Sequence, residues 1–227
     1  MPLQNIFPNP ADEQNAIANS LEMDIIFGHI PPLQRLIEDE LMARFSASRH
    51  RVRRAIDILA ARALVLRETN KGAHVCGYSE TEIEQIYELR DILHNAALRR
   101  IKFPIDPKII SALRTLHTAH IAAAALGDLE KVFHVNNRFH STIFNCCGSS
   151  PLIEAIELQA QRTYPIRTYS FGEKGYLTVA KSEHKKMIDA LEHGTVEALV
   201  LLCRSHIVRP PPQTPQPLLI KAGPIQS

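Results

Sequence analysis

The chain has 227 residues, 45% of them hydrophobic, and a formal net charge of only +2. This length and composition suit one large or two small globular domains, each able to bury a core. The sum of the charges gives no sign of an acidic partner, so the distribution of charge along the chain matters more than its total.

Compartment and membrane association can be addressed from the same composition. The N-terminus lacks the basic stretch and apolar run of a secretory signal, and we find no apolar stretch long enough to span a bilayer. We therefore expect a cytoplasmic protein with no membrane partner. The cysteines form neither a CxxC pair nor a disulfide framework, which suits reduced thiols in that compartment. They are Cys76, Cys146, Cys147 and Cys203.

The first elements in chain order are helices. Residues 1–11 have the composition of a disordered arm, and apolar residues at helical spacing predict a first helix over 12–27. Gly28 and the prolines after it end that helix. A short helix is expected over 38–45 and a third over 48–62.

The third predicted helix is strongly basic. Ser48 is a favourable N-cap residue for it, and Arg49 and Arg53 lie one turn apart on the same side. Taken alone, these arginines fit a solvated helix face as well as a DNA contact. Five arginines fall within eleven residues, with no acidic residue between Leu41 and Ile56: Arg44, Arg49, Arg51, Arg53 and Arg54.

A β-hairpin is predicted directly after the basic helix. Residues 64–68 and 73–75 have strand character, and Asn70, Lys71 and Gly72 form the turn between them. Three helices followed by a hairpin is the plan of the winged helix-turn-helix, whose third helix enters the major groove. The hairpin therefore favours DNA binding over the solvated-face interpretation.

From Ser79 onward the sequence predicts only helices, about six of them. Breaks fall at Asp106-Pro107, Gly127-Asp128, 148–151 and Gly194-Thr195. The predicted fold class is thus mainly α, with an N-terminal winged helix-turn-helix and a C-terminal all-α bundle. The expected domains are a DNA-binding domain over 12–77, a helical domain over 78–208 and a Pro-rich disordered tail over 209–227.

Three predicted helices of the bundle direct a histidine inward. Asn136 and His140 are four residues apart and project from one side of a helix, while His184 and His206 lie on the inward stripes of the last two helices. Neutral imidazoles are common ligands of zinc-like ions, and bundle cores are common places for such sites. The alternative is that the histidines simply fill the core.

A charge also falls within an apolar stripe. Arg90 and His94 lie in the middle of the inward face of the first bundle helix. A buried charge is costly unless something pairs with it, so the partner of Arg90 is either an internal carboxylate or a bound acid. Arg162 and Arg167 are further positive groups near such a cavity in this interpretation, although a surface position is favoured for both over one facing the cavity.

Several segments of the chain, taken in order, resemble the GntR-type regulators of the FadR subgroup. Residues 30–43 are similar to the run before the recognition helix, 48–56 to that helix, and 71–75 to the wing. Farther on, 84–90 is similar to the start of the FadR-type effector domain. Asn136 with 138–140, Glu183-His184 and Ser205-His206 match that domain's metal-binding pattern in order and spacing.

The resemblance implies specific roles. DNA would be contacted by Arg35, Ser48, Arg49, Arg51, Arg53, Lys71 and Gly72. A divalent metal, with zinc favoured over nickel or manganese, would be held by Asn136, His140, His184 and His206. A small carboxylic-acid effector would bind beside it at Arg90, His94 and Arg162. A homodimer would read a near-palindromic operator in double-stranded DNA.

Several positions depart from the family pattern. Leu33 stands where Gly is usual, so the turn there is expected to differ. Arg51 stands in place of Pro and Arg54 in place of Glu, which makes the recognition helix more basic and leaves its target sequence open. His94 replaces a usual Glu, and Asn136 replaces the commoner Asp. An amide oxygen is a weaker ligand than a carboxylate, so the metal is expected to be loosely held or completed by the effector.

The sequence therefore predicts a DNA-binding transcriptional regulator, a repressor rather than an activator, whose operator affinity depends on a metal-bound acid. It is not expected to be an enzyme. Two alternatives remain open: a metal-dependent hydrolase, since three histidines with open metal positions also suit hydrolysis, and a DNA-binding protein whose helical domain only dimerises.

Overall fold

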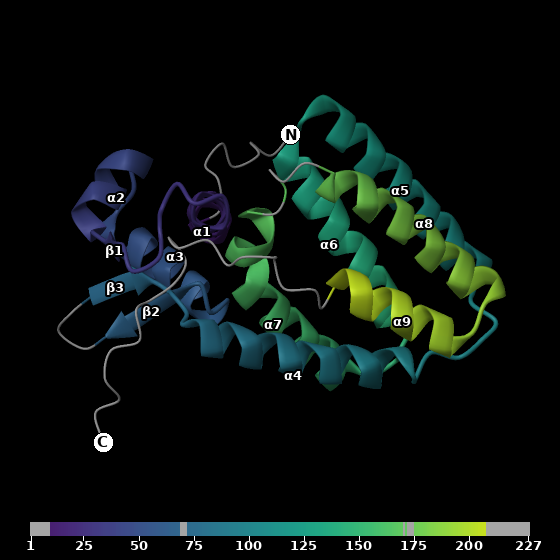
Figure 1. Cartoon of the computed structure of the whole chain (residues 1–227). Helices are drawn as coiled ribbons and strands as arrows, with labels where there is room; N and C mark the ends of the chain where they lie inside the picture. Colours follow the sequence, from purple (N-terminus) through teal and green to yellow (C-terminus); the bar gives the residue numbers. More distant parts are fainter. Residues whose placement is uncertain (1–9, 69–71, 170, 172–174, 208–227) are drawn as a thin grey trace, which may run out of the picture. The chain divides into compact units, whose positions relative to one another are not determined.

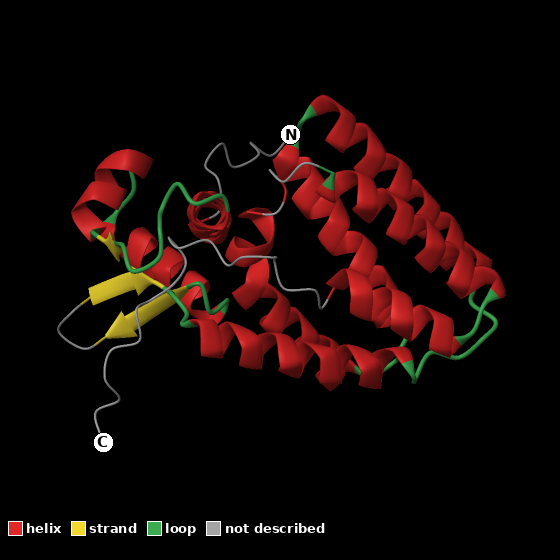
Figure 2. Cartoon of the chain, in the orientation of Figure 1, coloured by secondary structure: helices red, strands yellow, loops and turns green. Residues whose placement is uncertain are grey.

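The structure is a computed structural model of the whole chain, and it describes residues 10–68, 72–169, 171 and 175–207. The wing residue Lys71, the first nine residues and the Pro-rich tail lie outside these described residues. The described chain divides into two compact units, with the boundary between Ser79 and Glu80. Helices predominate in both, and the strands occur only in the first (Figures 1 and 2).

The N-terminal unit combines three helices with a three-stranded antiparallel sheet in the order β1-β3-β2. Arg35 of β1 lies opposite His74 of β3, and Val65 of β2 lies opposite Val75. Its elements are α1 (Pro10–Ile26), β1 (Arg35–Leu36), α2 (Glu38–Phe45), α3 (Arg49–Ala61), β2 (Val65–Glu68) and β3 (Gly72–Val75).

Helix α3 is fixed both by its cap and by its buried face. Ser48 is the N-cap, and its hydroxyl accepts a hydrogen bond from the backbone N–H of Arg51 (3.5 Å). The apolar stripe of α3 is buried against the rest of this unit's core: Val52, Ala55, Ile56 and Leu59. The arginines of α3 lie outside this stripe, as the helical spacing predicted.

Three details of this unit differ from the sequence-based expectations. Helix α1 begins at Pro10, inside the segment 1–11 expected to be disordered, because proline is favourable in the first turn of a helix. The short strand β1 was not predicted, since two residues carry no periodicity. Leu33 keeps the left-handed turn typical of glycine, with φ 65°, and donates its N–H to the Val75 carbonyl (3.0 Å).

The C-terminal unit consists of six helices in the described residues, which confirms the predicted all-α bundle. The predicted breaks coincide with the caps: Asp106 accepts from the backbone of Lys108, Gly127 adopts a left-handed φ, and Asp128 caps the next helix. The helices are α4 (Glu80–Leu98), α5 (Pro107–Leu126), α6 (Leu129–Asn145), α7 (Ser150–Tyr169), α8 (Tyr176–His193) and α9 (Val196–Ile207).

Helix α5 corrects the expectation that no stretch is long enough to span a bilayer. This 20-residue helix is long and apolar enough by length and composition, with a mean hydropathy of 1.3 over an 18-residue window. A single helix of this kind is weak evidence for a membrane span. In the bundle α5 packs against α6 and α8 and buries Ile110, Leu113, His120 and Ala123.

Candidate functional site

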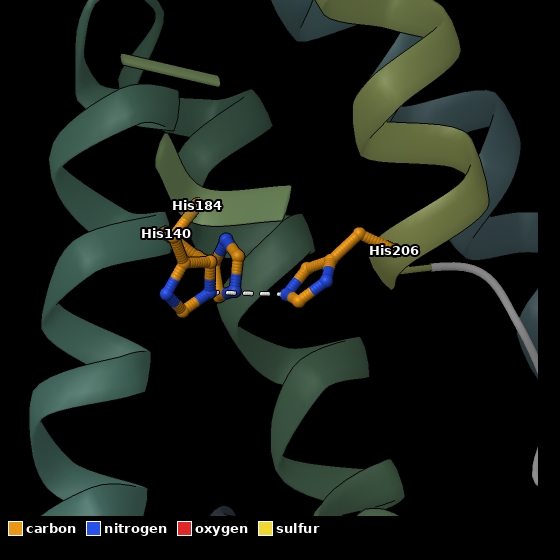
Figure 3. Close-up of side chains that lie close together, drawn as sticks. All are labelled: His140, His184 and His206. Carbon is orange, nitrogen blue, oxygen red and sulfur yellow. Dashed lines mark hydrogen bonds between the residues drawn. The ribbon is translucent and has the colours of Figure 1, made fainter. Parts of the chain in front are cut away.

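Three helices of the C-terminal unit bring one histidine each to the same point. His140 lies on α6, His184 on α8 and His206 near the end of α9. One nitrogen from each ring lies within 4.8 Å of the other two, and Figure 3 shows the three rings turned toward one another. The sequence predicted that each ring points into the bundle, and the fold adds that they meet.

Two contacts set the orientation of the His206 ring. Its Nδ1 lies 2.6 Å from Glu183 Oε2 and, because a carboxylate only accepts, Nδ1–H is the donor. Its Nε2 is therefore left with a lone pair, which faces His184 Nε2 at 3.1 Å. A carboxylate that holds a histidine in this way is typical of ligands to metal ions.

The cluster favours neutral imidazoles. His184 is fully buried, and burial together with the nearby His206, His120 and His117 lowers its pKa. Burial also lowers the pKa of His140 well below its usual value, with further contributions from His206 and His184. Neutral rings carry the lone pairs that a metal ion needs.

These residues fit a divalent metal ion. Both ring nitrogens of His140 and the Nδ1 of His184 are buried without a hydrogen-bond partner among the described residues, which is costly unless a ligand satisfies them. Nitrogens about 2.0–2.1 Å from a tetrahedral zinc ion lie about 3.3 Å apart, close to the 3.1 Å between His184 and His206. Asn136 lies one turn before His140 on α6 and is buried.

A cavity of about 50 Å³ adjoins the cluster and shares His140 with it. Its walls are largely apolar, with Phe144, Ile153 and Ile156 among them, but Arg90, His94 and Arg167 also line it. Arg162 is not among the lining residues and contacts Gln159 instead (3.4 Å). The structure thus brings Arg90 and His94 to this cavity, and Arg167 takes the position expected of Arg162.

Arg90 is buried without a counter-charge among the described residues. It is 1% exposed, its guanidinium donates to Thr163 Oγ1 and lies over the Tyr87 ring, and its Nε has no partner. Burial lowers the pKa of Arg90 to about 10, and the charge of Arg167 adds to this effect. Burial likewise holds the pKa of His94 well below its usual value. This corner of the cavity is positive and suits an anion.

The basic face of α3 in the N-terminal unit is exposed but already paired. Arg49 Nη2 donates to Asp39 Oδ1 (2.6 Å), and Arg53 Nε donates to both oxygens of Glu38 (2.9 and 3.0 Å). Hydrogen bonding to Glu38 raises the pKa of Arg53. Both acids come from α2, so the segment around α3 that lacks acidic residues in the sequence has acidic neighbours in the structure.

The other predicted DNA contacts are placed around this face. Ser48 caps α3, Arg51 lies in its first turn, and Arg35 lies on β1. Gly72 begins β3 with φ 85°, and a Cβ at this position would lie 3.4 Å from Nε and Nη2 of Arg35. The positive φ favours glycine at this wing position, whereas the Arg35 side chain would meet a Cβ only at ordinary contact distance.

Sequence reasoning missed some residues beside the histidine cluster. Glu183 directly precedes His184 and so projects to another side of α8, and that direction carries it to His206. His120 belongs to the buried stripe of α5 and lies against the His184 ring, with centroids 4.9 Å apart. Its spacing from Leu113 was a usable signal.

The architecture defines a class: a winged helix-turn-helix regulator joined to an all-helical ligand-binding domain. The comparisons agree. Residues 85–209 match the FCD domain, and residues 13–75 match the bacterial regulatory proteins of the gntR family. The chain belongs to the GntR family and carries the FCD, or FadR-type, C-terminal domain. It is a DNA-binding transcriptional regulator and not an enzyme, which removes the hydrolase alternative.

Individual relatives extend this picture. The chain is 30% identical over 137 residues to an HTH-type transcriptional regulator of Agrobacterium vitis from the TAR-I ttuE-ttuC' intergenic region, covering 59% of this chain and 78% of that protein. It is 30% identical over 135 residues to the gluconate operon transcriptional repressor of Bacillus subtilis, covering 59% and 55%. A GntR regulator structure from Rhodococcus sp. RHA1 shares the fold, with a TM-score of 0.69, 23% identity, and coverage of 86% and 94%.

Proposed function

We propose that the protein is a repressor whose affinity for its operator is controlled by a small carboxylic acid bound at a divalent metal ion in the FCD domain. The observation that carries this proposal is that His140 belongs both to the histidine cluster and to the cavity lined by the uncompensated Arg90. A metal ligand and a buried cation facing one small cavity form a site for an anion with a carboxylate head.

The proposed ligands of the metal are His140, His184 and His206, with Asn136 as the fourth protein group. The ion, with zinc favoured, supplies a Lewis-acidic position for one carboxylate oxygen. Arg90 is placed to donate charge-assisted hydrogen bonds to the acid, with His94 and Arg167 beside it. A cavity of 50 Å³ has room for about four water-sized groups, so the proposed acid has few non-hydrogen atoms or widens the cavity.

Operator binding is assigned to the α3 face of the N-terminal unit. Arg49 and Arg53 would exchange their carboxylate partners for DNA phosphates or guanine edges, with Arg51 and the N-cap Ser48 beside them. Arg35 and Gly72, with Lys71, are assigned to the wing. We propose that a homodimer in the cytoplasm presents two such units to a near-palindromic site.

Control follows from a difference in affinity. An acid that binds one packing of the bundle more tightly than another shifts the population toward that packing. A preference of about 1.4 kcal/mol suffices for a tenfold change in operator affinity. Repression is proposed because one relative, from Bacillus subtilis, is named a gluconate operon transcriptional repressor.

A direct test begins with DNA fragments that the protein itself selects from a randomised pool. Operator affinity is then measured by fluorescence anisotropy with zinc-loaded protein, with and without a panel of small carboxylic acids. We expect at least one acid to weaken binding tenfold or more, and His184→Ala to abolish the acid's effect while retaining DNA binding. An acid that binds tightly but leaves operator affinity unchanged would refute the proposal.

A further inference from the structure

Helix α5 contributes two histidines to the neighbourhood of the cluster that no proposed role yet uses. His117 and His120 lie one turn apart, and both approach His184, with ring centroids 6.2 and 4.9 Å away. His120 is 1% exposed. The Nδ1 atoms of His117, His120 and His184 are all buried without a partner among the described residues. Three unsatisfied nitrogens in adjoining rings call for an explanation.

The positions of the protons on the clustered rings supply an explanation for these nitrogens. His206 Nδ1–H is bound to Glu183, so its Nε2 carries a lone pair. In the metal-free site, one of the two facing Nε2 atoms, which lie 3.1 Å apart, carries the proton between His184 and His206. If both Nε2 atoms bind a metal ion, the proton of the neutral His184 ring must move to Nδ1. That nitrogen is buried, and its N–H then needs an acceptor.

We infer that His120 is this acceptor: its ring nitrogen receives the His184 Nδ1–H when the metal is bound and so fixes His184 as a ligand. The inference rests on the metal site proposed above. The His120 ring packs edge-on to His184, with centroids 4.9 Å apart and an interplanar angle of 67°, and the Nδ1 atoms of both rings are buried without a partner among the described residues. His120 is buried, and burial favours the neutral ring, which has one nitrogen able to accept. His120 would thus be a positioning residue, as Glu183 is for His206.

A second metal ion bound directly by His117 and His120 is the competing explanation, and the charges nearby disfavour it. Burial is the main cause of the lowered pKa of both rings, and the positive charges of Lys181 at His120 and of Lys185 at His117 add to it. A second cation placed there would be repelled. Only the three histidines of the first cluster meet as a set of metal-ligating groups in the described chain.

The test compares zinc affinity, measured by competition with a chromophoric chelator, in full-length variants. His120→Leu removes the acceptor, His120→Gln restores one as an amide oxygen, and His117→Ala is the matched control on the same helix. We expect His120→Leu to lower zinc affinity about 10- to 100-fold, as loss of an outer partner of a ligand histidine does. His120→Gln should recover most of it, and His117→Ala should change it less than about threefold, because its ring is farther from His184.

Other outcomes are decisive in different ways. Unchanged zinc affinity in His120→Leu would overturn the inference alone, since the wild type would still bind metal. A melting temperature lowered equally in metal-free His120→Leu and His120→Gln, with equal affinities, would assign His120 to packing. Two zinc ions per wild-type chain, reduced to one by His120→Leu or by His117→Ala, would establish the second site instead. No zinc binding by the wild type would refute the proposed function itself.

Discussion

Replacing Arg90 with methionine is expected to stabilise the metal-free protein while removing its ability to bind an acid. The guanidinium is buried without a counter-ion among the described residues, and burial lowers its pKa from the ordinary value of an arginine to about 10. At about 1.4 kcal/mol per pKa unit, the folded state loses about 3 kcal/mol by holding this charge at neutral pH. Because the folded pKa is the lower one, this penalty is present below about pH 10 and is relieved only as the pH rises from there toward the ordinary pKa of an arginine.

The net effect of Arg90→Met is smaller than that figure. The substitution also loses the hydrogen bond to Thr163 and the contact with the Tyr87 ring, together about 1–2 kcal/mol. A gain of about 1–2 kcal/mol remains, which corresponds to a rise in Tm of several degrees. Differential scanning calorimetry measures it, with the exposed Arg99→Met as control, which should stay within about 0.5 kcal/mol.

The acid-binding half of this prediction is measured by calorimetric titration with the acids that shift Tm in the wild type. Arg90→Met should show no binding at concentrations that saturate the wild type. A variant that is destabilised by several kcal/mol would show that Arg90 is a structural residue whose charge is already compensated in the folded protein. That result would contradict a role for Arg90 in binding an anion.

Four further predictions concern other parts of the molecule. Leu33→Gly should stabilise the N-terminal unit by about 0.5–1 kcal/mol, measured by urea unfolding. Leucine at φ 65° costs about 1–2 kcal/mol, and the greater chain entropy of glycine in the unfolded state offsets part of the gain from removing this cost. A loss of stability would contradict this. Asp39→Asn should raise DNA affinity several-fold and steepen its salt dependence, since it removes the closer of the two carboxylates beside Arg49 and a charge that repels phosphate; unchanged binding would show that the pair is irrelevant to DNA. Glu183→Gln should lower zinc affinity about 10- to 100-fold, because His206 loses its carboxylate; an unchanged zinc dissociation constant would remove Glu183 from the site. In the presence of a chelator, the free energy of unfolding should fall as the pH falls from 6.5 toward 4, by up to about 1.4 kcal/mol per pH unit from His120 alone. The reason is that His120 becomes protonated in the unfolded chain over this range but stays neutral in the folded chain down to its pKa of about 4. Denaturant unfolding at pH 7.5 and 5.5 would show the slope, and a flat profile would contradict it.

The fold was largely predictable because its signals are local. Capping residues such as Asp106, Ser48 and Asp128 mark helix starts by their own chemistry, and apolar spacing identified the buried faces of α3, α6 and α8. The two-residue strand β1 carried no such signal, because it exists only through pairing with β3. Leu33 was expected to change its turn, but hydrogen bonding to Val75 retains the left-handed conformation.

The site was predictable in its members more than in its connections. Inward spacing selected His140, His184 and His206, but nothing in one sequence shows that Glu183 reaches His206 or that His120 packs on His184. These contacts join different helices, so they depend on how the bundle packs. The pairing of Arg49 and Arg53 with acids of α2 escaped notice for the same reason.

The central claim, an acid held on a metal ion at the histidine cluster, is tested most directly by a thermal-shift screen of the zinc-loaded protein against small carboxylic acids, with and without a chelator. A ligand of the native state raises Tm by mass action. The account predicts that at least one acid raises Tm, that chelation abolishes this shift, and that the metal-free protein melts at a lower temperature. Acids that stabilise the chelated protein equally, or a Tm that responds to neither chelator nor acids, would contradict it.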